Sequence, residues 1–164
     1  MVTIRQMAAS DWPTVSEIYA QGIETGFATF ETELPSYNTW NKNHITTCRF
    51  VAEKSEKVAA WAALSPVSGR CVYGGIGEVS VYVGKKYRGM GIGKLLMKHL
   101  ILESEKQGLW TLQAGIFPEN KGSIKLHEIV GFRKIGFREK VGKLHGEWKD
   151  NLLFERRSKK VGLD

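Results

Sequence analysis

Cysteine is scarce in this sequence, and metal-ligand patterns are missing. Cys48 and Cys71 are the only cysteines among 164 residues, and they form no CxxC pair. The four histidines show no HExxH-type spacing. A disulfide framework is therefore not expected, and neither is a metal site.

Long apolar runs are also missing. No segment approaches the roughly 20 consecutive apolar residues of a membrane-spanning helix. The N-terminus, from Met1 to Arg5, lacks the charged and then apolar pattern of a signal peptide. These absences predict a cytoplasmic protein in a reducing compartment, with no membrane partner.

Length and composition describe one folded domain. Hydrophobic residues make up 42% of the chain and charged residues 25%, which are ordinary values for a globular protein. A chain of 164 residues is long enough for a single core. No repeat, linker or low-complexity tract divides it, so we expect one domain over residues 1–157 and a basic tail over residues 158–164. The end of the chain from Arg156 to Asp164 is expected to fray.

Positive charge is in excess. Lysine and arginine total 24 against 17 aspartates and glutamates, a net charge of +7. This balance indicates an anionic partner, such as nucleic acid, a phosphate-rich cofactor or a membrane surface. A nucleic-acid-binding module is one alternative. The sequence has no signature of such a fold and no interleaving of aromatic and basic residues, so no nucleic-acid partner is expected.

Strands and helices alternate along the chain, which predicts a mixed α/β domain. Strands are expected at residues 2–4, 49–53, 58–64, 78–83, 111–116, 135–138 and 151–155. Helices are expected after residues 11 and 36, from 92 towards 108, and at 121–130. The strand at 78–83 alternates strictly, with three valines on one face and Glu78, Ser80 and Tyr82 on the other.

A glycine-rich turn carries the strongest chemical signal. Arg88-Gly89-Met90-Gly91-Ile92-Gly93 follows the strand at 78–83 and opens an amphipathic helix, with Lys94 beside it. Glycines allow a ligand to approach the backbone, and a helix N-terminus offers unpaired N–H groups. The turn therefore predicts a phosphate-binding site, although its spacing is neither that of a P-loop nor GxGxxG. The alternative is a turn whose glycines only permit close packing of helix on strand.

Two spaced motifs resemble those of the GNAT family of N-acetyltransferases. The turn fits that family's R/Q-x-x-G-x-G/A signature, and the segment from Asn120 to Phe132 is similar to its N-x-x-S-x-x-L-[Y/H]-x-x-x-G-F block. Arg70-Cys71-Val72-Tyr73 and the strand from Glu78 look like blocks of its phosphinothricin and methionine sulfoximine acetyltransferase subfamily. The resemblance covers nearly the whole chain.

The resemblance implies a fold and a co-substrate. The fold is a mixed, mostly antiparallel sheet flanked by helices, with a central splay between the strands that begin at Glu78 and Thr111. The co-substrate is acetyl-CoA, bound at that splay. The implied cofactor-binding residues are Val81, Tyr82, Val83, Arg88, Gly89, Met90, Gly91, Ile92, Gly93, Lys94, Asn120 and Ser123. Asn120 or Ser123 also suits a helix N-cap, and the two roles are compatible.

Catalytic residues follow from the same resemblance. Acetyl transfer needs a neutral amine, a polarised thioester carbonyl and a protonated leaving thiol. Glu78 is the expected general base, and the alternative is an exposed carboxylate at a strand end. His127 stands where family members carry a tyrosine proposed to protonate the departing sulfur. Its alternative is a helix histidine bonded to a backbone carbonyl.

Arg70, Tyr73 and Phe30 are expected to bind the acceptor substrate. An arginine pairs bidentately with a carboxylate, which suits an amino-acid-like amine. The expected function is acetylation of the primary amine of a small molecule such as phosphinothricin or methionine sulfoximine or sulfone. The resemblance also implies a homodimer. Alternatives are an acetyltransferase for peptide N-termini or antibiotic amines, and a non-catalytic acetyl-CoA sensor.

Overall fold

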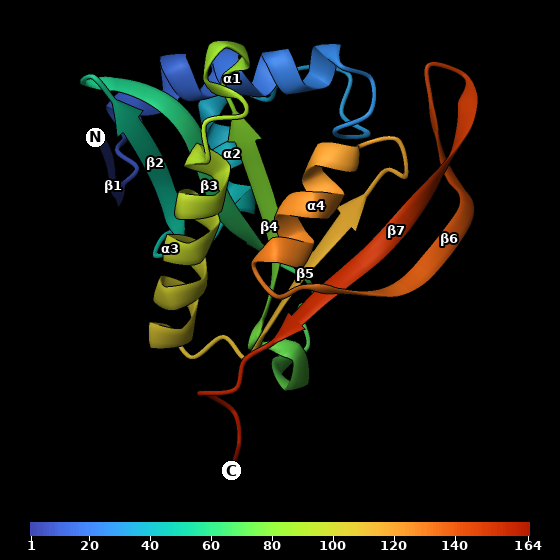
Figure 1. Ribbon diagram of the computed structural model, residues 1–164. Helices are drawn as coiled ribbons and strands as arrows, with labels where there is room; N and C mark the ends of the chain where they lie inside the picture. Colours follow the sequence, from blue (N-terminus) through green and yellow to red (C-terminus); the bar gives the residue numbers. More distant parts are fainter.

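The computed structural model describes residues 1–164 as one seven-stranded sheet with helices on both faces (Figure 1). The strands are β1 (Val2–Gln6), β2 (Arg49–Lys54), β3 (Lys57–Pro66), β4 (Ile76–Val83), β5 (Thr111–Ile116), β6 (Arg133–Leu144) and β7 (Glu147–Arg157). They lie in the order β1-β2-β3-β4-β5-β7-β6, and only the β4–β5 pairing is parallel. The predicted mixed, mostly antiparallel sheet is confirmed.

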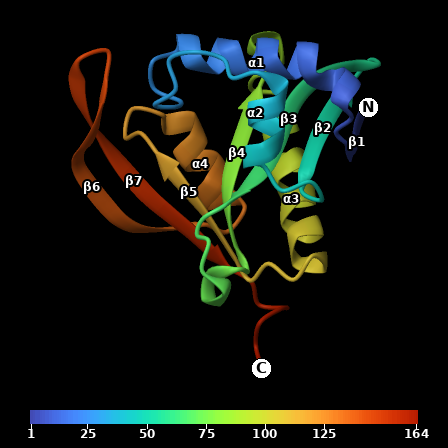
Figure 2. The same ribbon diagram turned by 180° about the vertical axis from the view of Figure 1, so that it is seen from behind.

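Four helices flank the sheet. They are α1 (Trp12–Glu24), α2 (Tyr37–Asn43), α3 (Ile92–Lys106) and α4 (Lys121–Ile129). Figure 1 shows α3 and α4 in front of the sheet, and Figure 2 shows α2 on the opposite face with α1 crossing one end. None of these helices combines the length and apolarity needed to cross a membrane.

Each face of the sheet has its own hydrophobic core. On the α3 face, Leu96 and Leu100 pack with Leu64 and Phe154 in a cluster of 20 buried residues. On the α1 face, a smaller cluster surrounds Trp61. The predicted alternation of β4 is confirmed, because its three valines pack against the first cluster and Tyr82 against the second.

The ends of the helices follow from local chemistry. Pro13 occupies the first turn of α1, where its missing N–H costs nothing. The Ser36 hydroxyl accepts a hydrogen bond from the Thr39 N–H and begins α2. After α4, Gly131 takes a φ of +98°, a left-handed conformation that glycine adopts without strain.

The last hairpin is much longer than predicted. Strands were expected at 135–138 and 151–155, but β6 and β7 extend over 133–144 and 147–157. β6 is the edge strand and almost entirely exposed, so its sequence lacks the alternation that marks a half-buried strand. The turn uses His145 and Gly146, both with positive φ, as a tight hairpin turn requires.

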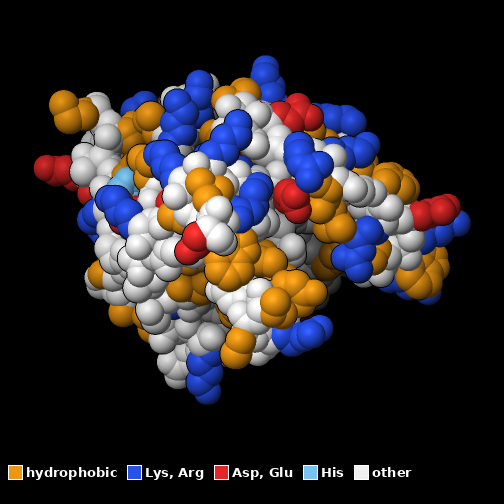
Figure 3. Space-filling view, turned by 90° about the horizontal axis from the view of Figure 1, so that it is seen from below, with side chains coloured by type: hydrophobic (Ala, Val, Ile, Leu, Met, Phe, Trp, Pro, Cys, Tyr) orange, Lys and Arg blue, Asp and Glu red, His pale blue; other side chains and the backbone are white.

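The C-terminal tail is fastened, so the prediction that it frays is wrong. The Arg157 guanidinium donates to the carbonyls of Trp110 and Val161. Ser158 is buried, and its hydroxyl donates to Glu105 at 2.8 Å. Elsewhere on the surface the charge is dispersed: Figure 3 shows lysine and arginine side chains scattered over one face.

Candidate active site

A cleft opens where two neighbouring strands part. β4 and β5 pair only from Ile76 to Glu78 and from Thr111 to Gln113, and beyond these residues they diverge. The cleft has a volume of about 1210 Å³. Its walls are β4, β5, the glycine turn, α4, the loop after α1 and part of the β6–β7 hairpin.

The glycine turn forms one end of this cleft. Gly89 and Gly91 have φ of +76° and +78°, and a Cβ at either position would meet nothing within 4 Å. None of the backbone N–H groups of residues 88–94 donates to a backbone carbonyl. An open run of unpaired N–H groups at a helix start suits an oxyanion such as a pyrophosphate.

Gly93 has a different role in the same turn. A Cβ at this position would lie 3.3 Å from a Val83 methyl group and 3.4 Å from Leu126. Gly93 therefore allows α3 to pack closely on β4 and α4. The packing interpretation of the turn therefore applies at Gly93, whereas the open space at Gly89 and Gly91 is compatible with a bound ligand.

The edge of β4 that faces the cleft lacks a partner strand. β4 pairs with β3 from Gly77 to Val83, but its other edge is paired only from Ile76 to Glu78. Val81, Tyr82 and Val83 line the cleft on this open edge. The Val83 carbonyl accepts a hydrogen bond from the Arg88 side chain at 3.2 Å. An extended, amide-bearing ligand can pair with such an edge.

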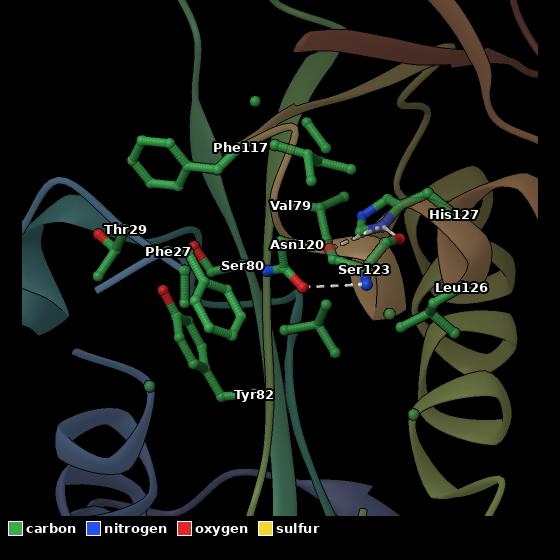
Figure 4. Close-up of a pocket in the computed structure, with 18 of the residues that line it drawn as sticks. Phe27, Thr29, Val79, Ser80, Tyr82, Phe117, Asn120, Ser123, Leu126 and His127 are labelled. Atoms are coloured by element: carbon green, nitrogen blue, oxygen red, sulfur yellow. Dashed lines mark hydrogen bonds between the residues drawn. The ribbon is translucent and has the colours of Figure 1, made fainter. Parts of the chain in front are cut away.

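The wall made by α4 places three polar residues together (Figure 4). The Asn120 side chain caps the helix by accepting from the Ser123 N–H at 3.2 Å. His127 is 2% exposed, and its Nδ1 lies 2.7 Å from the Ser123 carbonyl. Since a carbonyl only accepts, Nδ1 carries the proton in this bond.

The chemistry of His127 follows from its burial. Burial lowers the pKa of the imidazole, so the ring is neutral at pH 7. In that form Nε2 carries no proton, and it has no hydrogen-bond partner in the protein. The arrangement matches the alternative of a helix histidine bonded to a backbone carbonyl.

Glu78 sits at the point where the strands part. It is exposed, and Gln113, its register partner on β5, donates from Nε2 to Glu78 Oε2 at 3.1 Å. The sequence analysis missed Gln113. The strand that contains Gln113 was expected beside the strand of Glu78, but the register that pairs these two residues was not predicted.

Aromatic side chains close the far side of the cleft. Phe27, Thr29 and Phe30 come from the loop after α1, and all three line the cleft. The Phe30 ring lies 4.7 Å from that of Phe117. In Figure 4, Phe27, Thr29 and Tyr82 stand opposite the α4 side chains. Burial raises the pKa of the Tyr82 hydroxyl, so that group stays neutral.

Three of the predicted site residues lie outside the cleft. Arg70 and Tyr73 belong to an exposed loop between β3 and β4, where the guanidinium lies 5.5 Å from the tyrosine ring centre. The Met90 sulfur lies 3.2 Å from Lys54 Nζ, also outside the cleft. All the other predicted residues line it.

A splayed sheet, an unpaired strand edge and an open helix start define a class of acyltransferases that hold an extended, phosphate-bearing thioester. The sequence profile of the acetyltransferase (GNAT) family matches residues 4–132. The chain therefore belongs to the acetyltransferase (GNAT) family.

Individual relatives agree with this assignment. The phosphinothricin N-acetyltransferase of Streptomyces viridochromogenes is 31% identical over 159 residues, which cover 94% of this chain and 87% of that protein. A GNAT superfamily phosphinothricin acetyltransferase from Sinorhizobium meliloti, solved in complex with AcCoA, has a TM-score of 0.89 at 28% identity, covering 99% and 91% of the two chains. A ribosomal-protein-alanine N-acetyltransferase from Brucella melitensis has a TM-score of 0.87 at 30% identity, covering 95% and 99%.

Proposed function

We propose that the chain transfers an acetyl group from acetyl-CoA to the primary amine of a small amino-acid-like molecule. The observation that carries the proposal is the junction at Glu78. There an exposed carboxylate meets an unpaired strand edge that leads to the open N–H groups of residues 88–94. The phosphinothricin acetyltransferases among the relatives support this class of acceptor.

Acetyl-CoA binds along the cleft in this proposal. The N–H groups of residues 88–94 hold its pyrophosphate, and Lys94 adds positive charge beside them. The amide-bearing arm pairs with the open edge at Val81, Tyr82 and Val83. Asn120 and Ser123 contact the cofactor from the start of α4. The bound thioester supplies an activated acetyl carbonyl.

Glu78 is the proposed general base. The amine nitrogen forms a bond to the acetyl carbon, the carbon–sulfur bond breaks, and the amine proton passes to Glu78 directly or through a water. Gln113 holds the carboxylate by the hydrogen bond to Oε2. The departing thiolate takes up a proton from solvent, and Glu78 releases the amine proton to solvent, so that protons balance over the cycle.

His127 keeps a proposed place in the site, next to the cofactor. A proton donor role would need a ring protonated at Nε2, and the lowered pKa opposes this form. We therefore propose that His127 chiefly fixes the start of α4 through its bond to the Ser123 carbonyl.

Phe30 is proposed to form a wall of the acceptor pocket. Arg70 and Tyr73 lie outside the cleft of their own chain, so they can meet an acceptor only in the cleft of a second copy or after a loop movement. We propose the former, in a homodimer. The two unpaired cysteines favour the cytoplasm as the setting.

A thiol-release screen with acetyl-CoA tests the function. The acceptors are amino acids, amino-acid analogues, polyamines, aminoglycosides and peptide N-termini. We expect turnover with amino acids or their analogues. Activity confined to peptides would replace this proposal with N-terminal acetylation, which the Brucella melitensis relative favours. Tight acetyl-CoA binding without turnover on any amine would indicate a sensor.

A further inference from the structure

Two polar residues in the cleft have no assigned role. Arg138 on β6 and Asn151 on β7 are direct register partners in the antiparallel hairpin. Side chains of such partners stand on the same face of a sheet. Both residues line the cleft. Figure 1 shows the hairpin that carries them extending beyond the helices.

Neither side chain forms a hydrogen bond or an ion pair within the protein. Arg138 is exposed and forms no ion pair or side-chain hydrogen bond, and Glu31, the acid of the opposing loop, does not bind it. Asn151 is 8% exposed as a whole residue. Its side-chain amide forms no hydrogen bond within the protein, and its polar atoms are not among those that are fully buried without a partner. The amide therefore reaches the cleft and is available to a ligand.

The local backbone supports the placement of both residues. The register between β6 and β7 shifts between Arg138 and Gly142, and bulges of this kind redirect side chains. The Lys140 N–H in this bulge donates to Asp150 Oδ1 at 2.8 Å. On β5, a Cβ at Gly115 would lie 2.7 Å from Asn151 Oδ1, so the asparagine occupies space that only glycine leaves.

The pair shares a face of the sheet with the proposed base. Gly115 lies two residues after Gln113 on β5, and residues two apart in a strand face the same way. Gln113 holds Glu78, and Asn151 lies over Gly115. Glu78 and Arg138 therefore act on the same side of the cleft floor.

Arg138 and Asn151 lie away from the cations at the end of the cleft proposed to bind the cofactor. The other cations that line the cleft belong to the glycine turn and to α4: Arg88, Lys94, Lys121 and Lys125. Arg138 is the one cation of the hairpin that lines the cleft. β6 is the third strand along from β4, about 14 Å across the sheet at usual strand spacing. Asn151, the partner of Arg138, also lies four residues along β7 from Glu155, which is in register with Gln113 and so with Glu78, a further offset of about 13 Å along the strands. An α-carboxylate lies too close to its own amine to span that separation easily, so a distal group fits better.

We propose that Arg138 and Asn151 bind a distal oxyanion of the acceptor, such as a side-chain carboxylate or a phosphinate. The guanidinium and the Asn151 amide donate to this group while the amine faces Glu78. The proposal rests on the proposed function and narrows it to amines that carry a second, negatively charged group remote from the reacting nitrogen.

Steady-state kinetics with isosteric acceptors test the proposal. L-Glutamate and L-glutamine differ only in the distal charge, and phosphinothricin carries a phosphinate there. We expect the wild-type kcat/KM to favour the charged acceptors. Arg138→Leu should raise their KM about 10- to 100-fold, the usual range for losing a charge-assisted hydrogen bond, and leave L-glutamine and acetyl-CoA unaffected.

Two further variants sharpen the comparison. Asn151→Asp keeps the size but repels an oxyanion, so it should raise KM for the charged acceptors only. Arg133→Leu removes another exposed arginine of β6, which pairs with Glu155 outside the cleft, and should change nothing. Equal effects of Arg138→Leu on L-glutamate and L-glutamine, or no effect, would overturn the proposal.

Measurements of acceptor binding distinguish failure of the proposed anion site from failure of the proposed function. If the wild type acetylates no amine, the proposed function fails. Calorimetric titration of phosphinothricin and L-glutamate into the wild type and Arg138→Leu still decides the anion site. We expect binding that Arg138→Leu weakens by the same factor. Equal binding to both proteins, or binding to neither, would refute the site.

Discussion

The position of Glu78 in the cleft depends on the register between β4 and β5. It is the last residue of β4 that pairs with β5, and Gln113 holds its carboxylate. The alternation of residues 78–83 predicted which way Glu78 faces. The family resemblance implied that this strand and the one from Thr111 are neighbours, but not the register that places Gln113 opposite Glu78, because pairing between strands so distant in sequence leaves no local signal.

The first prediction concerns this carboxylate. Glu78→Gln should lower kcat about 10²–10⁴-fold, as expected for loss of a general base, with acetyl-CoA binding unchanged. Turnover is measured by thiol release and binding by calorimetry. Glu119→Gln, another carboxylate of the cleft, serves as control and should retain kcat. A Glu78→Gln enzyme with normal turnover would remove Glu78 from the chemistry.

The second prediction concerns the glycine turn. Gly91→Val should weaken acetyl-CoA binding, because a side chain would enter the open cradle and strain a residue with φ of +78°. Gly122→Ala is the control, since Gly122 lines the same cleft with negative φ and free space around it. Calorimetry on protein verified as folded by circular dichroism gives the answer. Unchanged affinity in Gly91→Val would count against a pyrophosphate site here.

The third prediction is a pH dependence of stability. Burial lowers the pKa of both His44 and His127 below the unfolded value of about 6.5. The unfolded chain therefore binds more protons, so the stability that these groups contribute is complete above about pH 6.5 and declines as the pH falls below it.

Urea unfolding between pH 7.5 and 5 measures this decline. His127→Asn should flatten the profile, whereas His145→Asn, in the exposed hairpin turn, should not. A wild-type stability that stays constant across this range would contradict the assignment.

Among the elements, those with strong local signals were predicted and those without were not. The alternating valines predicted β4, and Asn120 predicted the start of α4. The β6–β7 hairpin was underestimated, because an exposed edge strand needs no hydrophobic alternation. The tail was misjudged, since its anchors, Trp110 and Glu105, are distant in sequence. Because the extent of the β6–β7 hairpin was underestimated, the pairing of Arg138 with Asn151 was not predicted either.

The fourth prediction compares two helix caps. Asn120→Ala and Ser36→Ala each remove a side chain that accepts from a helix N–H, and each should cost about 1 kcal/mol of stability. Only Asn120 lines the cleft, so only Asn120→Ala should also weaken acetyl-CoA binding. Denaturant unfolding and calorimetry are the two measurements. Equal acetyl-CoA affinity in both variants would leave Asn120 a capping residue alone.

At the scale of the whole molecule, the exposed loop of Arg70 matters most. Val72 and Tyr73 in the same loop are exposed hydrophobic residues, as are Phe137 and Trp148 of the hairpin. Surfaces of this kind are often covered by a partner.

The fifth prediction is a homodimer. Light scattering at micromolar concentration should give twice the chain mass of 18.4 kDa. Mixed dimers of Arg70→Ala and Glu78→Gln chains should recover activity if each cleft uses the partner copy's loop. A monomeric mass would end this prediction, and mixed dimers without recovery would place Arg70 outside the acceptor site.

The short junction between β4 and β5 has a mechanical consequence. Only three residue pairs of strand pairing join the β1–β4 half of the sheet to the β5–β7 half, although both halves contribute to the core under α3. Just below them, Trp110 donates its N–H to the Gly75 carbonyl, and the tail binds back to Trp110 through Ser158. β4 and β5 are therefore joined at one end and separate at the other. A strand-like ligand placed between β4 and β5 would supply hydrogen bonds where the strands have diverged, so it would extend the sheet across the gap and connect its two halves.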